Sequence, residues 1–357
     1  MSLKKRFAVL PLVVGLLLAP ALPAAALEGC GEVPVYFYHP RDYGSDSRYN
    51  PLNALVDYSL DTLQIPESFG SDDLGGQFDE VLDNLGDPGG AIEEEGGLRD
   101  FVNRQVFPID LSNSAESVEM IPNYGLHLFG GGMLFRRDLE WFRCHGVRWP
   151  ALWAGLLAMT GELAQEVIEK ETTTPDDEVA DFYIFRPLGM LLFSFDPVAR
   201  WAAEDMGMRA WPHQPMVSLS RGKAANVGIN FVLRPRWFGA DLPRPFLYFG
   251  LNNMVGLAHR RSQGDTISWA VGGATERVSS SSVTLRPSAG LFYDRHGSLL
   301  GSLIFNGTED LAARLNVFPG VVGSGPWSPG IFFAVENGGG LQGGISLRWM
   351  PLGPSGG

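Results

Sequence analysis

The stretch LYFGLNNMVGL, residues 247–257, carries an apolar side chain at nearly every second position. Between the apolar positions lie small or polar residues, among them Gly250, Asn252 and Gly256. Successive side chains of a β-strand point to opposite faces, so this alternation indicates a strand with one apolar and one polar wall. An outer-membrane β-barrel has such walls, the first facing lipid and the second facing its lumen.

The same alternation returns at residues 227–233, 283–293 and 341–349. About nine strand candidates follow Pro212, and single-chain bacterial barrels have even strand numbers. The sequence therefore predicts a mainly β fold, an antiparallel outer-membrane β-barrel of 8 to 10 strands with an inserted helical segment of about three helices. The count depends on whether Val33 to Tyr38 forms a first strand. The alternative is a soluble β-sandwich with a helical insertion, but its exposed face should carry more charge than these Gly, Ser and Asn positions do.

The first residues follow the pattern of an export signal, with Lys4, Lys5 and Arg6 before the apolar run Phe7–Leu18. We expect cleavage after Ala26 and residence in the cell outer membrane. Later in the chain, no run reaches the roughly 18 to 20 apolar residues of a membrane-spanning helix.

The chain has two cysteines, Cys30 and Cys144. Export would bring both to an oxidising compartment, where a disulfide can persist. A lipid on Cys30 would exclude that bond, and two unpaired thiols are a third alternative.

The formal net charge is −13, with most of the excess before Met120. Such a surface repels phosphate backbones, which argues against nucleic acid as a partner. The expected partners are outer-membrane lipids and the barrel-insertion machinery, with any small-molecule ligand unknown. The stretch from Asp72 to Gly97 has few large apolar residues and reads as a loosely ordered loop.

Residues 121–211 change to helical spacing. The clearest helix runs from about Pro150 to Lys170, with an apolar face that includes Trp153 and Leu156, and with Glu162 and Glu166 on the opposite side. A later helix begins at Asp196-Pro197 and ends at Gly207. A group of four charged residues reads as an exposed helix end: Arg136, Arg137, Asp138 and Glu140.

Three different short motifs follow one another along the chain. They are His127 within Asn123–Gly131, Gly161-Glu162 with Glu166, and Asp181 followed by Pro187-Leu188-Gly189. This layout resembles VanZ-like and YfiM-like membrane-associated proteins, and an uncharacterised family of outer-membrane proteins with helices embedded in a barrel chain. The resemblance covers about residues 121–196. It departs from the family pattern where Glu178-Val179-Ala180 lacks the usual serine and where Phe193 replaces a glycine. It implies a location and a helical arrangement, and no settled mechanism.

The candidate catalytic site is the cluster His127, Glu162, Glu166 and Asp181, whose residues have no assigned role. A histidine with carboxylates can bind a divalent metal or serve acid/base chemistry on a lipid headgroup. The plainer interpretation places Glu162, Glu166 and Glu169 in water. No His-Glu-x-x-His or phosphate-loop motif is present. No cofactor is expected, and whether a metal binds stays open.

The favoured function is a non-catalytic envelope or structural role in the outer membrane. The alternative is an outer-membrane lipid-modifying enzyme, an acyl or headgroup transferase or hydrolase that uses the cluster. A small pore is a third class, although a narrow lumen is normally filled by side chains. The expected division is 1–26 signal peptide, 27–120 acidic Gly-rich segment, 121–211 helical segment, 212–352 β-barrel strands and 353–357 tail.

Overall fold

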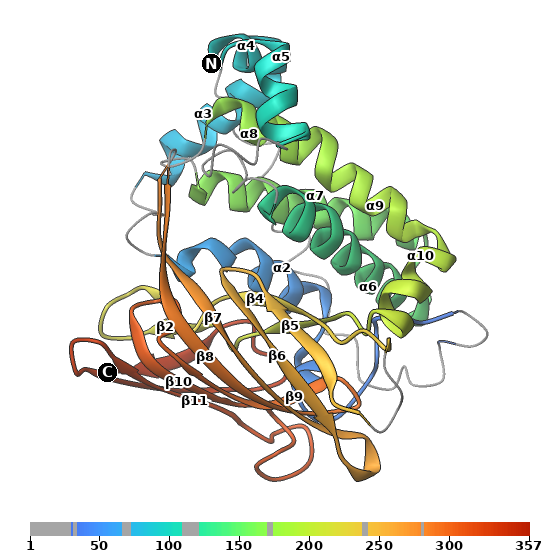
Figure 1. The fold of residues 1–357 in the computed structure, drawn as a ribbon, viewed down its shortest axis with the longest axis vertical. Helices are drawn as coiled ribbons and strands as arrows, with labels where there is room; N and C mark the ends of the chain where they lie inside the picture. The colour runs from blue at the N-terminus through green and yellow to red at the C-terminus, as the bar shows by residue number, and fades with distance from the viewer. Residues whose placement is uncertain are drawn as a thin grey trace.

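The computed structural model describes residue 30 and residues 34–65, 73–108, 121–169, 174–237, 242–279 and 282–357. A layer of helices packs against one side of a curled β-sheet (Figure 1). The predicted signal peptide, residues 1–26, lies outside the described residues. Among those that are described, no helix combines the length and the apolar character needed to cross a membrane.

The described helices fall into two groups along the chain. The first group is η2 (Ser45–Arg48), α2 (Pro51–Ser59), η3 (Asp61–Gln64), α3 (Leu74–Gly86), α4 (Pro88–Glu94), α5 (Leu98–Phe101) and η4 (Val102–Val106). The second is η6 (Ile121–Gly130), α6 (Gly131–Cys144), α7 (Pro150–Glu169), α8 (Pro175–Ala180), η7 (Asp181–Phe185), α9 (Arg186–Ser194), α10 (Asp196–Arg200) and η8 (Trp201–Asp205). Here η2 and η3 are 3₁₀-helices, and η4, η6, η7 and η8 are π-helical.

One mixed sheet holds the strands, in the order β1-β4-β5-β6-β7-β8-β9-β10-β11-β12-β13-β2-β3. Their bounds are β1 Arg209–Pro212, β2 Met216–Ser218, β3 Ala224–Ala225, β4 Ile229–Leu233, β5 Arg244–Phe249, β6 Asn252–Arg260, β7 Asp265–Ser279, β8 Ser282–Arg295, β9 Ser298–Phe305, β10 Leu311–Val317, β11 Gly330–Glu336, β12 Leu341–Ser346 and β13 Gly353–Gly356. The 3₁₀-helix η9 (Ser262–Gly264) joins β6 to β7.

The prediction of a closed, antiparallel barrel of 8 to 10 strands was wrong. The sheet is mixed, because β13 pairs with β2 in parallel, and it has 13 strands. The number of strands exceeds the prediction partly because one predicted strand is two strands in the structure. Residues 247–257 form a hairpin in which Leu247 pairs with Val255. The final residues, predicted as a tail, form β13, which pairs with both β12 and β2.

Both ends of the sheet belong to one stretch of chain. β1 pairs with β4, and β2 pairs with β3 and β13, yet only residues 213–215 separate β1 from β2. The inside of the curl is filled by its own side chains. The Gln214 amide donates to Asn316 Oδ1 (3.3 Å) and to the carbonyl of Ile331 (3.3 Å), and Ser346 donates to Gln214 Oε1 (2.6 Å).

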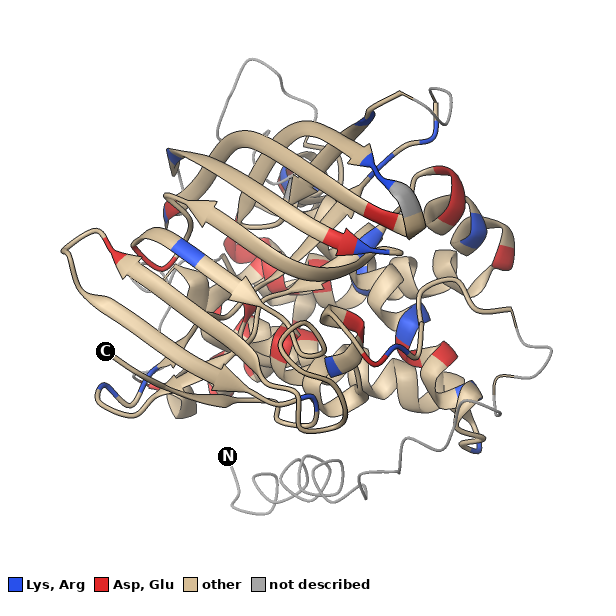
Figure 2. Cartoon of the chain, turned by 90° about the horizontal axis from the view of Figure 1, so that it is seen from below, with Lys and Arg blue, Asp and Glu red and all other residues tan. Residues whose placement is uncertain are grey.

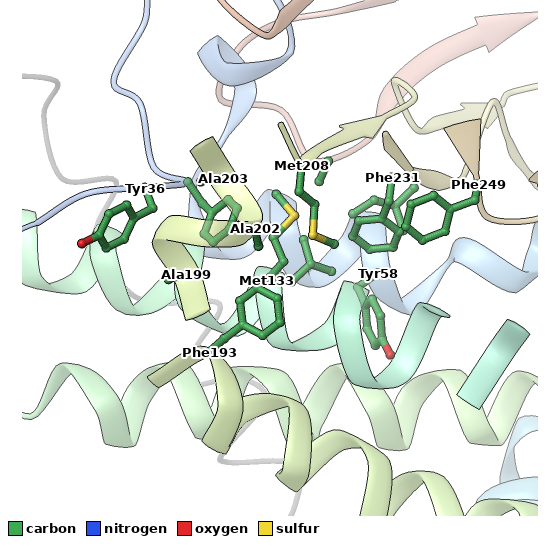
Figure 3. Packing of buried hydrophobic residues seen from close by; sticks show 14 residues of the cluster. Tyr36, Tyr58, Met133, Phe193, Ala199, Ala202, Ala203, Met208, Phe231 and Phe249 are labelled. Atoms are coloured by element: carbon green, nitrogen blue, oxygen red, sulfur yellow. The ribbon is translucent and has the colours of Figure 1, made fainter. Parts of the chain in front are cut away.

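The apolar face of the sheet has two environments. At β4 and β5 it packs against the helices, where Phe231 and Phe249 join Met133 and Phe193 in one buried cluster (Figure 3). From β6 to β12 the same face is uncovered in the described chain, and its large apolar side chains are exposed. Figure 2 shows these strands mostly in the tan of uncharged residues.

Two predictions for the N-terminal segment were wrong. Residues 34–38 do not form a strand, because the backbone N–H groups of Tyr36, Phe37 and Tyr38 donate to the carboxylate of Glu140 at 2.8 to 3.0 Å. The predicted loop is helical over α3 and α4. The side chains of Asp73 and Asp87 accept hydrogen bonds from the first turns of these helices, which offsets the weak helix propensity of their glycines.

A disulfide joins Cys30 to Cys144 at the end of α6. Of the three alternatives for the cysteines, the structure therefore contains the bonded pair. A sulfur in this bond cannot also carry a lipid.

Candidate functional site

Three helical elements bring a histidine and two carboxylates together. His127 lies in η6, Glu162 in α7, and Asp181 begins η7. The imidazole Nδ1 is 2.8 Å from Glu162 Oε1, and Nε2 is 3.4 Å from Asp181 Oδ2. The structure thus places both ring nitrogens of His127 against carboxylates contributed by segments far apart in the chain.

Glu162 has two further partners. Tyr58 of α2 donates its hydroxyl to Glu162 Oε2 at 2.6 Å, and Arg186 Nε lies 3.5 Å from the same oxygen. The Arg186 guanidinium also stacks 4.4 Å above the Tyr58 ring. Gly161 permits this approach, since a Cβ there would lie 2.8 Å from Tyr58 Cδ1.

Burial and charge act against each other at this site. Burial alone would lower the pKa of His127, but Asp181 and Glu162 outweigh it and raise that pKa to about 10. Burial likewise opposes ionisation of Glu162, yet His127 and then Arg186 bring its pKa down to about 2. At neutral pH the histidine is therefore a cation held between two carboxylates.

Glu166 lies one turn beyond Glu162 on α7 and is 1% exposed. Neither of its carboxylate oxygens has a hydrogen-bond partner within the described part of the chain. Burial, followed by repulsion from Asp181 and Glu169, raises its pKa well above the ordinary value for glutamate. Burial and these like charges consequently disfavour ionisation of Glu166.

The donor set of His127, Glu162 and Asp181 fits a divalent metal ion. One ligand atom from each residue lies within 4.8 Å of the other two. One imidazole and two carboxylates suit zinc and other transition metals. Glu166, the fourth residue of the predicted cluster, is not part of this group. All four residues are at most 4% exposed, so a substrate cannot reach them without rearrangement of the helices.

The sequence predicted α7 correctly but assigned its faces wrongly. The helix spans Pro150–Glu169, whereas Lys170 lies outside the described residues. Trp153, which belongs to the predicted apolar face, is 38% exposed, while Glu162 of the opposite face is fully buried. The interpretation of Glu162 and Glu166 as solvated residues is thus wrong. Partners from other segments made the difference, because buried charges are tolerated when they are paired.

Sequence reasoning missed Tyr58 and Arg186. Arg186 directly precedes the Pro187-Leu188-Gly189 motif, so its position next to a recognised element was an available signal. Tyr58 lies in a helix more than 60 residues before the first motif. No local pattern connects it with Glu162.

The four residues predicted as an exposed helix end form a second buried network. Arg136 contacts Glu140 at 2.8 Å and Asp196 at 2.7 Å, and Arg137 contacts Asp46 at 2.7 Å. Asp138 accepts a short hydrogen bond from the Tyr49 hydroxyl. The prediction of an exposed helix end was therefore wrong. Arg136 and Arg137 are buried because Asp196 of α10 and Asp46 of the N-terminal segment pair with them.

In comparisons with known proteins, no family model, curated protein or solved structure matches this chain.

Proposed function

We propose that this protein is an integral outer-membrane protein with a structural, non-catalytic role in the cell envelope, immersed through the uncovered apolar face of its sheet. A continuous row of paired residues carries the proposal. It runs across six neighbouring strands in the order Leu257, Trp269, Leu291, Leu303, Leu315 and Phe333.

Exposure of this face supports contact with lipid. Val255 is 61% exposed, Val271 54% and Ile345 56%. Monomeric soluble proteins rarely expose contiguous apolar patches larger than a few hundred Å², and larger patches mark interaction surfaces. Here the row crosses six neighbouring strands of the 13-stranded sheet, so a bilayer is a fitting partner.

Strand length indicates where immersion is deepest. A tilted strand needs roughly 9 to 11 residues to cross the hydrocarbon core. β6, β7 and β8 have 9, 15 and 14 residues, whereas β9 to β12 have 6 to 8. We therefore place the deepest part of the protein at β6 to β8.

The interior of the curl favours a structural role over a pore. Gln214 reaches backbone carbonyls on two other strands, so side chains occupy the space that a channel would need. The Cys30–Cys144 disulfide supports an oxidising compartment, which agrees with export.

The second candidate is a lipid-modifying enzyme that uses the His127 cluster. The unpartnered carboxylate of Glu166 beside a metal-compatible set of ligands favours it. The structural role is preferred because the cluster is enclosed and because the charges of His127 and Arg186 are balanced by those of Glu162 and Asp181.

Membrane fractionation tests the proposal. Wild-type protein should stay with membranes after an alkaline carbonate wash and should float with vesicles in a density gradient. Val271→Asp places a charge on the uncovered face and should reduce retention, since charge on a lipid-facing strand costs up to a few kcal/mol. Leu98→Asp is the matched control, because Leu98 is 65% exposed on α5, away from the sheet. Release of the wild-type chain by carbonate would contradict the proposal.

A further inference from the structure

A cavity of about 310 Å³ opens where the chain passes from the helices into the sheet. Ala203 and Gly207 lie on its helical side, and Thr266 and Asp294 on its strand side. Its lining holds six arginines: Arg41, Arg209, Arg234, Arg236, Arg244 and Arg260.

The pairing of the strands places these arginines near one another, although they are distant in the sequence. Arg209 pairs with Val232 in β4, Arg244 with Ala258, and Arg260 with Thr266. Val232 and Ala258 belong to the buried cluster inside the curl, so the arginines point to the same concave side at one rim of the sheet. We name this feature the arginine pocket.

The positive charge of the arginine pocket is only partly neutralised. Arg234 pairs with Asp294 at 2.5 Å, and Arg41 pairs with Asp46 at 2.5 Å. Among the described residues, no hydrogen bond or ion pair engages the side chains of Arg236, Arg244 or Arg260. Three guanidinium groups with no anionic partner therefore face one cavity.

Unsatisfied donors in the pocket favour an anion there. The Nε atom of Arg244 is enclosed and has no hydrogen-bond partner in the described structure, and the same holds for Arg209 Nε. A buried donor without an acceptor is unfavourable, and an anion in the cavity would supply one. Nearby, burial lowers the pKa of His39 to about 3, and the charge of Arg209 adds to this shift.

We propose that the arginine pocket binds a phosphate group, and that its source is the headgroup of an anionic membrane lipid. Guanidinium groups match phosphate with paired N–H donors, and several of them can hold one multiply charged group. The identification of a lipid rests on the proposed function, whereas phosphate binding itself does not.

The outer side of the same rim supports the lipid source. Trp237 is 70% exposed, Leu242 60% and Tyr293 37%. Amphipathic aromatic rings favour the depth of lipid headgroups in a bilayer. The arginine pocket thus opens next to the strands for which we propose the deepest immersion.

Binding titrations of the full chain in maltoside detergent test the proposal. The probes are dihexanoyl phosphatidylglycerol, glycerol 3-phosphate and inorganic phosphate, each measured by calorimetry. The lipid should bind wild-type protein, and Arg244→Gln with Arg260→Gln should weaken binding by about tenfold or more for each arginine removed. Arg99→Gln on α5 removes one positive charge far from the pocket, as each single change in the pocket does, and should leave affinity unchanged.

The outcomes separate the possible sources. Tighter binding of the lipid than of both soluble phosphates supports a lipid headgroup, and equal binding of all three overturns the lipid source while supporting a phosphate site. Absence of binding to wild-type protein, or equal affinity in the double variant, overturns the phosphate site. The single variant Arg236→Gln, at an exposed position, repeats the test if the double variant fails to fold. Carbonate retention of the double variant should equal that of wild type, so failure here differs from failure of the proposed function.

Discussion

Two neighbouring glutamates of α7 should respond in opposite directions to the same substitution. Glu162→Gln removes the negative charge that faces the His127 cation and Arg186. Glu166→Gln removes a carboxyl group that has no hydrogen-bond partner in the described chain. Both changes keep the shape of the side chain, so each effect reports charge rather than packing.

The size of the first effect follows from the site. The pKa of Glu162 falls from 4.5 to about 2, which corresponds to about 3 kcal/mol of stability. Removing one partner of a buried ion pair costs about 3 to 5 kcal/mol, so two arguments agree. The shift of His127 describes the same contact and is not added to it.

The second effect has the opposite sign. Because the pKa of Glu166 is raised, the folded state binds a proton that the unfolded chain releases above its ordinary pKa near 4.5. The stability that this proton contributes is therefore lost as pH rises above that value. Glu166→Gln cannot lose this proton and should be more stable than wild type at pH 7.

Denaturant unfolding in detergent with a metal chelator measures both changes through tryptophan fluorescence. The wild type should also lose stability between pH 6.5 and about 10 as His127, whose pKa is raised, releases its proton in the folded state. In Glu162→Gln this loss should shift to lower pH, because the carboxylate that holds the proton is gone. A Glu162→Gln protein within about 1 kcal/mol of wild type would refute the reasoning, as would destabilisation of Glu166→Gln equal to that of Glu162→Gln.

Three further tests address other parts of the molecule. Peptide mapping without reductant should yield a linked Cys30–Cys144 pair, and Cys144→Ser should lower stability by up to about 5 kcal/mol, because the bond closes a 114-residue separation; two free thiols would contradict this. Gly189→Ala should cost about 1 to 3 kcal/mol in denaturant unfolding, since its Cβ would lie 2.4 Å from the backbone oxygen of Leu128, while Gly155→Ala, with open space around it, should be neutral or stabilising. Added zinc should raise the thermal unfolding midpoint of wild type and not that of Glu162→Gln, and an unchanged midpoint in wild type would remove the metal interpretation.

The alternation of apolar and polar residues predicted where strands lie better than it predicted how the strands join into a sheet. Alternation located β4, β8 and β12, because side chains on two sides of a strand meet different surroundings whatever their partners are, but it merged β5 and β6 into one run. The parallel contact between β2 and β13 depends on residues at opposite ends of the sheet sequence, and alternation carries no information about it. The same reason explains the failure at Tyr36, whose backbone is bound by Glu140, 104 residues away.

The site was predicted in part for a comparable reason. His127, Glu162 and Asp181 were selected as charged residues in mainly apolar helical surroundings, and the structure brings them together. Asp73 and Asp87 are residue types that favour helix N-caps, so the sequence contained a local signal for α3 and α4. Burial of the α7 glutamates was not readable, since it depends on Tyr58 and Arg186 from other segments.

The pairing of β2 with β13 also affects the order in which the sheet can form. β2 is made early, yet the strand that satisfies one of its edges follows almost all of the remaining sheet. Contacts between residues so distant in sequence form slowly, because a long loop must close first. Until β13 arrives, β2 presents unpaired backbone groups on which a second chain could add a strand. The arrival of residues 353–356 therefore affects how long this edge of β2 stays open to aggregation.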